Sequence, residues 1–256
     1  MENLLIFLFK LIVCPVLLAI ATIAARRWGQ IVGGLIIGLP LISGPISVFL
    51  AIENGADFAV AAVDGSFVGT ISLAFFSLAY ARLCRFGITA SVFAGMLVFG
   101  SVSAAVSACH PTTEILAVTS VAALCLCSFL MPKEKAENSV KLSKYDIPLR
   151  MAVMAVLMVV VTFLAPLIGP HATGIAAAFP YMALTMAVFA QWKGTYQHAQ
   201  QVMYGLVNGL GSGCAFYMVV SCTLKDDNLL AAYSLAAAVS ILVQFVIMML
   251  IRRTKA

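Results

Sequence analysis

Apolar runs of about 20 residues follow one another along almost the whole chain. The hydrocarbon core of a bilayer is about 30 Å thick, and a helix needs roughly 20 apolar residues to cross it. Of the 256 residues, 63% are hydrophobic and 10% are charged. A soluble domain of this size would need more polar surface to cover its core. The chain is therefore predicted to be an all-α polytopic membrane protein.

The first apolar run, residues 4–25, resembles a signal peptide only in its length. Its leading segment is Met1-Glu2-Asn3, and Arg26-Arg27 follow the run. This order of charges is the reverse of the order in a cleaved secretory signal. The run is therefore interpreted as a retained first span.

Charged residues and clusters of Gly and Pro divide the chain into about nine transmembrane helices. They are expected near residues 4–25, 30–52, 57–81, 87–108, 113–131, 149–168, 171–191, 196–223 and 229–251. With this division, 13 of the 15 Lys and Arg residues lie on one side of the membrane, Lys225 lies on the other side, and Lys10 lies within the first span. The 13 are Arg26, Arg27, Arg82, Arg85, Lys133, Lys135, Lys141, Lys144, Arg150, Lys193, Arg252, Arg253 and Lys255. Cytoplasmic loops are the ones enriched in Lys and Arg. The amino terminus is therefore predicted outside, and the carboxyl terminus in the cytoplasm.

An internal duplication appears when the sequence is shifted by 140 positions. The shift pairs Gly29 with Gly169, Gly34 with Gly174, Pro40 with Pro180, Val48-Phe49 with Val188-Phe189, Ala59 with Ala199, Gly65 with Gly205, Gly69 with Gly209, Ser72 with Ser212, and Phe76 with Phe216. Spans one to four would then correspond to spans six to nine. Because the offset is five helices, equivalent spans cross in opposite directions, which predicts an inverted 4+1+4 repeat. The predicted units are residues 1–131 (first repeat and linker span), 132–148 (cytoplasmic loop) and 149–256 (second repeat).

The second span should be interrupted, because residues 33–45 contain two prolines and four glycines. Pro40 and its counterpart Pro180 each lie roughly 14–15 Å from the nearer end of their spans. The two interruptions are therefore expected near the middle of the membrane. One hypothesis is that freed carbonyls and half-helix ends line a central site that includes Pro40, Ser43 and Pro180. The alternative is that both prolines are kinks of the kind that membrane helices tolerate.

Polar side chains recur at helical spacing in the eighth span. They are Gln197, Gln201, Tyr204, Asn208 and Ser212. The equivalent positions of the third span include Asp57, Asp64 and Ser72. Two such stripes suggest a shared wet interior, with Gln201, Tyr204, Asn208, Ser212 and Ser72 as candidate substrate-binding residues. The alternative is that these groups are hydrogen-bonding contacts between helices, and the neighbouring Gly-x-x-x-Gly pairs at 65/69 and 205/209 predict close helix packing.

Asp64 is the most informative single residue, because a carboxylate inside an apolar span is costly. Lys10 is expected at a similar depth, roughly 10–12 Å from the outer face. The two residues are predicted to pair, with a proton or a cation able to compete for the carboxylate. The alternatives are a purely structural ion pair and a Lys10 side chain that extends to the outer interface.

No enzyme signature occurs in the sequence. It contains no phosphate-binding loop, no H-E-x-x-H and no nucleophile elbow. The seven cysteines form no C-x-x-C pair and are expected to be buried apolar residues. The chain is therefore predicted not to be an enzyme, and neither a cofactor nor a metal is expected.

Residues 33–55, GGLIIGLPLISGPISVFLAIENG, resemble the core of small GlpM-type bacterial inner-membrane proteins. The whole chain looks like two such units joined by a linker span, although the second copy has Thr185 and Lys193 in place of Pro45 and Glu53. The paired halves of opposite orientation are also similar to the drug/metabolite transporter superfamily. These resemblances imply a multi-pass protein of the bacterial inner membrane that exports or exchanges small molecules.

The leading hypothesis is an inner-membrane secondary transporter of a small organic molecule or amphiphile, with proton coupling through Asp64. The alternative is a non-transporting membrane subunit, or a lipid flippase or helper in envelope biosynthesis. The partners expected are the lipid bilayer and an unidentified small-molecule substrate, with a homodimer as the candidate assembly and no nucleic acid.

Overall fold

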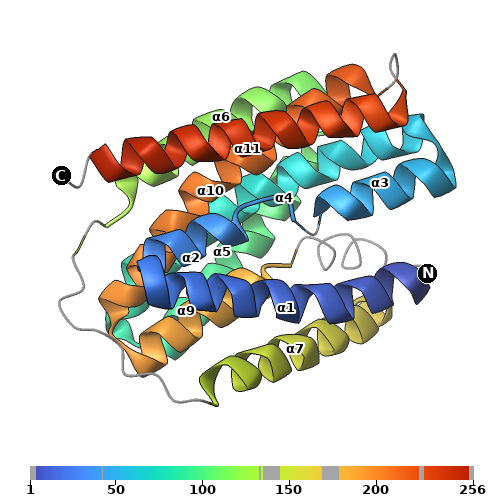
Figure 1. Cartoon of the computed structure of the whole chain (residues 1–256). Helices are drawn as coiled ribbons and strands as arrows, with labels where there is room; N and C mark the ends of the chain where they lie inside the picture. The colour runs from blue at the N-terminus through green and yellow to red at the C-terminus, as the bar shows by residue number, and fades with distance from the viewer. Residues whose placement is uncertain are drawn as a thin grey trace.

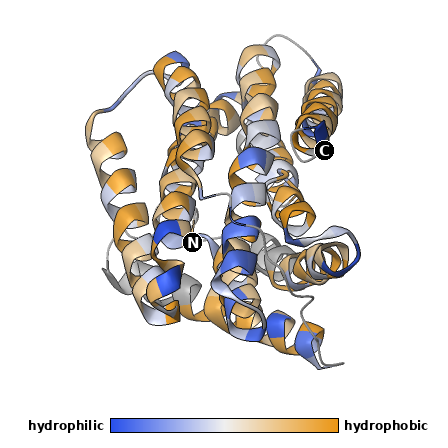
Figure 2. Ribbon diagram, turned by 90° about the vertical axis from the view of Figure 1, so that its left-hand side faces the viewer, coloured by the Kyte–Doolittle hydropathy of each residue, from blue (hydrophilic) through white to orange (hydrophobic). Residues whose placement is uncertain are grey.

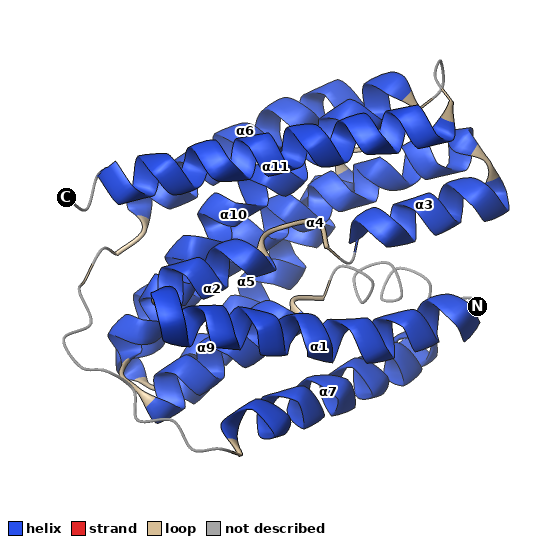
Figure 3. Ribbon diagram, viewed as in Figure 1, coloured by secondary structure: helices blue, strands red, loops and turns tan. Residues whose placement is uncertain are grey.

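All regular structure in the described part of the chain is helical (Figure 3). The computed structural model describes residues 4–41, 43–132, 134, 145–168, 179–224 and 228–253. The helices are α1 (Leu4–Trp28), α2 (Gln30–Ile37), α3 (Ser43–Asn54), α4 (Ala56–Leu83), the 3₁₀ helix η1 (Cys84–Phe86), α5 (Ile88–Ala108), α6 (Thr113–Leu130), α7 (Asp146–Ile168), α9 (Tyr181–Lys193), α10 (Tyr196–Thr223) and α11 (Leu229–Arg253). No strand occurs within these ranges, which agrees with the predicted all-α class.

Six segments in the described ranges are long and apolar enough to cross a membrane. They are Leu11–Trp28, Ala56–Phe86, Ile88–Ala108, Thr113–Leu130, Tyr196–Thr223 and Leu229–Ile251. Large apolar side chains such as Phe93 on α5, Phe129 on α6 and Phe245 on α11 are exposed on the outside of the bundle. Hydrophobic residues run along most of the length of the helices (Figure 2). Such surfaces support a membrane-embedded protein. Contact of large apolar side chains with water is unfavourable, whereas the lipid chains of a bilayer can cover them.

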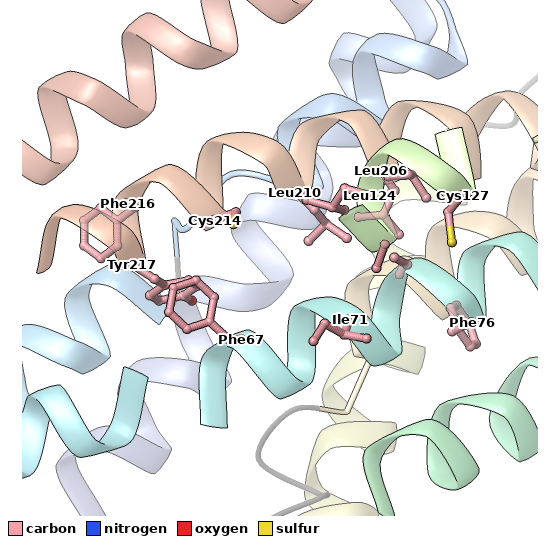
Figure 4. Packing of buried hydrophobic residues seen from close by; sticks show 14 of the residues in the cluster. Phe67, Ile71, Phe76, Leu124, Cys127, Leu206, Leu210, Cys214, Phe216 and Tyr217 are labelled. Atoms are coloured by element: carbon pink, nitrogen blue, oxygen red, sulfur yellow. The ribbon is translucent and has the colours of Figure 1, made fainter. Parts of the chain in front are cut away.

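The helix α10 lies in the middle of the bundle. It packs against α2, α4, α6, α9 and α11, while α4 also contacts α3, α5 and α6. The main hydrophobic core joins α4 to α10 and α6, with Phe67 and Phe76 on one side and Leu206, Leu210 and Phe216 on the other (Figure 4). The helices α1, α7 and α9 form a second group, which shares a smaller core (Figure 1).

The contact between α2 and α10 is made by small residues that bring the two backbones together. A Cβ atom added to Gly205 would meet the Ile31 carbonyl, and one added to Gly209 would lie 2.6 Å from the Leu35 oxygen. The predicted close packing at Gly205 and Gly209 is therefore confirmed. At Gly65, by contrast, no atom lies within 4 Å of an added Cβ, so the same prediction is wrong there.

The predicted interruption at Pro40 is present. The helix α2 ends at Ile37, and α3 begins at Ser43. Pro40 has no N–H to donate. The N–H of Leu39 donates to the Ile36 carbonyl at 3.2 Å, three residues back, instead of to the Leu35 carbonyl as in an α-helix. In the second repeat, α9 begins at Tyr181, directly after Pro180. Residues 169–178 lie outside the described residues, so an interruption of a longer helix there stays a prediction.

Single glycines connect several helix pairs, among them α1 with α2 and α3 with α4. Gly29 separates α1 from α2 with φ of 97°, and Gly55 separates α3 from α4 with φ of 88°. A side chain at either position would be strained in this left-handed region. These glycines let the chain reverse direction within one residue, so that neighbouring helices pack closely.

The ends of α1 and α4 and the start of α7 lie on the same side of the bundle (Figure 1) and carry basic residues: Arg26, Arg27, Arg82 and Arg150. Arg26 on α1 contacts Asp146 on α7 at 2.9 Å, and Arg82 on α4 donates to the Leu130 carbonyl of α6 at 2.8 Å. Exposed aromatic rings stand beside basic residues in the same region: Trp28, Phe86 and Trp192. Rings and cations in this combination are typical of a membrane–water interface.

Candidate functional site

Two sets of hydroxyl groups, from four helices in all, lie along the first turns of α3. On one side, the hydroxyl of Tyr217 on α10 interacts with those of Ser43 on α3 and Ser66 on α4. One helical turn further along α3, the Tyr233 hydroxyl of α11 lies 2.7 Å from Ser47 Oγ and donates to the Ser47 carbonyl at 2.8 Å. These five residues are called the hydroxyl cluster below.

The interruption at Pro40 is what brings the hydroxyl cluster together. The 12 residues of α3 span about 18 Å, so the first turn of this helix lies about 18 Å from its other end, close to residues of α4 and α10. Phe216 packs against Gly44, and the rings of Phe67 and Tyr217 meet edge to face with 5.9 Å between their centroids. A helix N-terminus attracts negative charge and hydrogen-bond acceptors. The hydroxyl cluster therefore offers donors and acceptors to a polar group in an otherwise apolar interior.

Of the residues predicted at a central site, Ser43 belongs to the hydroxyl cluster and Pro40 precedes it. Pro180 is buried at the start of α9. Four members of the cluster were missed from the sequence: Ser47, Ser66, Tyr217 and Tyr233. A buried tyrosine in an apolar helix needs a partner for its hydroxyl. That requirement was the available signal, but it does not identify the partner.

Asp64 lies on α4, and its Oδ1 is buried without a hydrogen-bond partner in the described part of the chain. The side chain of Lys10 falls outside the described residues. The helix that carries Lys10, α1, packs against α2, α7 and α9, whereas α4 packs against α3, α5, α6 and α10. The predicted pairing of these two residues therefore stays a prediction.

Members of the two predicted polar stripes form hydrogen bonds with different helices. Ser72 lies 3.0 Å from Ser103 on α5, and Asn208 accepts a hydrogen bond from Ser128 on α6 at 3.1 Å. Ser212 donates to the Gly209 carbonyl of its own helix. The hydrogen bonds described for these three residues lie within and between helices, and their predicted part in substrate binding stays a prediction.

Tyr204 faces a different environment from the hydroxyl cluster. With Asn208 and three apolar residues of α11, it lines an open groove of about 160 Å³ between α10 and α11. Gln201, one turn before Tyr204 toward the start of α10, is half-buried. The groove opens on the outside of the bundle, where lipid would meet it.

A buried ion cluster joins α1 to α7. Asp146 Oδ2 lies 2.9 Å from Arg26 and 2.9 Å from Arg150, and the exposed fractions of the Asp146 and Arg150 side chains are 0% and 4%. Arg150 also reaches Met186 Sδ at 3.3 Å and lies over the Phe189 ring of α9. In the sequence, Arg150 was interpreted only as part of the cytoplasmic charge bias. The spacing of Asp146 and Arg150, four residues apart, indicates a pair, but does not predict its burial.

Comparison of the chain with family models, curated proteins and solved structures gives no match.

Proposed function

We propose that the chain is a secondary transporter of the bacterial inner membrane that moves a small organic molecule or amphiphile. The observation that carries this proposal is the hydroxyl cluster, in which the first turns of the half-helix α3 meet residues of α4, α10 and α11. Transporters built from inverted repeats use such discontinuous helices to bind substrates near the midplane. The proposed resemblance to GlpM-type proteins and to drug/metabolite transporters agrees with this role.

The proposal includes nine spans arranged as an inverted 4+1+4 repeat. In it, α1, α2–α3, α4 and α5 correspond to α7, α9, α10 and α11, with α6 as the linker span. Equivalent contacts support this assignment: α4 packs against α5 as α10 does against α11, and α6 contacts both α4 and α10. The pairs α3–α4 and α9–α10 also correspond. The end of the bundle that is rich in basic residues would face the cytoplasm.

The first test is a ligand-stabilisation screen on the purified protein, followed by uptake into proteoliposomes. Tyr217→Phe removes one hydroxyl from the cluster and keeps the ring. It is expected to lower both the stabilisation by a screened ligand and its uptake by about tenfold, because hydrogen bonds in a low-dielectric site carry much of its specificity. Thermal stability without ligand checks that the variant is folded.

Tyr204→Phe is the matched control, because it makes the same change on the same helix in the groove between α10 and α11. It is expected to bind and transport the ligand as the native protein does. If Tyr204→Phe loses uptake and Tyr217→Phe does not, the hydroxyl cluster is not the substrate site.

Asp64 is proposed as the coupling residue. Asp64→Asn keeps the shape of the side chain in a neutral form, so proton-driven accumulation should be lost while exchange of substrate persists. Uptake would be measured at two pH values alongside thermal stability, with Asp57→Asn on the exposed first turn of α4 as the control. A loss of folded protein together with an unchanged pH dependence would assign Asp64 a structural role instead.

The second candidate function is a non-transporting membrane subunit or a lipid-handling helper. The direct backbone contact between α2 and α10 favours it, because helices packed in this way leave no space for a substrate between them. The test uses proteoliposomes and measures both ligand accumulation and the movement of labelled lipids between leaflets. Lipid movement without accumulation of any screened ligand would support this candidate and contradict the first.

A further inference from the structure

At the C-terminal end of α2, backbone carbonyl oxygens lack the N–H partners that a continuing helix would supply. The N–H of Leu39 donates to Ile36, so the Leu35 carbonyl has lost its usual helical partner. Gln244 of α11 replaces that partner, because its Nε2 donates to the Leu35 oxygen at 3.2 Å. The carbonyl of Gly38 lies nearby and faces Gly213 of α10. This is the negative end of the α2 helix dipole.

Two side-chain oxygens of α11 are buried without hydrogen-bond partners in the described part of the chain. Ser240 Oγ and Gln244 Oε1 have no hydrogen-bond partner among the described residues, and the two residues are only 2% and 7% exposed. The amide nitrogen of Gln244 is already directed at Leu35, so its oxygen is available only as an acceptor. Residues four apart lie on the same face of a helix, so the two side chains lie one helical turn apart on one face of α11.

The helix α11 crosses the interruption between α2 and α3. Tyr233 contacts Ser47 on α3, and Gln244 contacts Leu35 on α2. Ser240 lies between them, roughly 10 Å along the helix from Tyr233 and 6 Å from Gln244. Its hydroxyl is therefore at the level where the chain leaves the helical conformation.

We propose that the end of α2 and the inward face of α11 bind a small monovalent cation, Na⁺. The ligands would be Gln244 Oε1, Ser240 Oγ and carbonyl oxygens of the interrupted helix. Hard cations take oxygen ligands, and a set without a carboxylate suits a single positive charge. Carbonyls of unwound backbone and the C-terminal ends of half-helices bind Na⁺ in transporters of this general design. Binding of Na⁺ at this site does not depend on the proposed function. Only the coupling of Na⁺ to transport rests on it.

The site can be tested without a transport substrate. The thermal unfolding of the purified full-length protein in detergent would be followed in NaCl, KCl and choline chloride at equal ionic strength. Na⁺ is expected to raise the melting temperature saturably and more than the other two cations, because it binds the folded state. Equal effects of the three cations would overturn the proposal, and this is the result expected if only water occupies the site.

Variants of α11 assign the effect to the site. Ser240→Ala removes one oxygen, and Gln244→Met removes one oxygen together with the amide nitrogen that donates to Leu35. Each should raise the Na⁺ concentration for half-maximal stabilisation by about tenfold, and Ser240→Ala is the variant that leaves the bond to Leu35 in place. Ser234→Ala, at an exposed position of the same helix, should leave it unchanged. A Na⁺ response that is the same in Ser240→Ala and Gln244→Met as in the native protein contradicts the site.

Transport assays separate this inference from the proposed function. If ligand uptake is observed but Na⁺ gives no specific stabilisation, the Na⁺ site is contradicted and the proposed transport function stands. If Na⁺ gives a specific stabilisation that depends on Ser240 but no screened ligand is taken up, the Na⁺ site stands and the proposed transport function is contradicted.

Discussion

Asp146→Asn is expected to lower the free energy of unfolding by roughly 3–5 kcal/mol, the cost of removing one partner from a buried ion pair. The carboxylate bonds to Arg26 and Arg150 at 2.9 Å each, and its side chain is fully buried. Its loss leaves the buried guanidinium of Arg150 with a neutral amide, Met186 and the Phe189 ring. Chemical or thermal unfolding of the purified protein in detergent measures the effect.

The control substitutions for Asp146→Asn are made at residues that are more exposed to solvent. Arg26→Gln should cost less, because the Arg26 side chain is 27% exposed and water can replace part of the bond. Glu114→Gln, at an exposed position in the first turn of α6, should cost little. Replacing Asp146 and Arg150 together by leucine should recover much of the stability that Asp146→Asn loses. An Asp146→Asn variant as stable as Glu114→Gln would contradict a buried, stabilising carboxylate.

Gly205→Ala is the second large change expected. An added Cβ would meet the backbone of Ile31 rather than a flexible side chain, so α2 and α10 must move apart. Overpacking of this kind costs about 1–3 kcal/mol, and separating these helices also disturbs the contact of Leu35 with Gly209. The loss of unfolding free energy would be measured in the same detergent.

Gly65→Ala is the matched control, because the shift of 140 positions pairs it with Gly205 and its added Cβ meets no atom within 4 Å. Alanine has a higher helix propensity than glycine, so this change should be neutral or stabilising by up to about 1 kcal/mol. Equal destabilisation by the two substitutions would show that backbone approach does not distinguish the two glycines.

Local features of the helices could be predicted from the sequence, because they depend on residues close together in the chain. The apolar runs predicted helices over most of the described ranges, and Pro40 predicted the interruption between α2 and α3. Gly205 and Gly209 predicted a close helix contact, but the partner α2 was not identified. Chain length and the missing proline N–H are enough for such predictions.

The partners of the polar residues could not be predicted in this way. Ser72 and Asn208 were predicted at a shared wet site, yet they contact α5 and α6, respectively. The periodicity of a helix predicts which residues share a face, but it does not identify the neighbouring helix on that face. Which hydrogen bonds form therefore depends on packing between segments far apart in the sequence.

By itself, the sequence determined that the chain forms apolar helices and where α2 must stop, because both follow from local covalent geometry and from the transfer of apolar side chains to lipid. Only the tertiary structure decided that Tyr217 joins Ser43 and Ser66, and that Asp146 lies buried between Arg26 and Arg150. In an apolar interior a polar group needs a partner within about 3 Å. Helix packing alone brings such partners together from different parts of the chain.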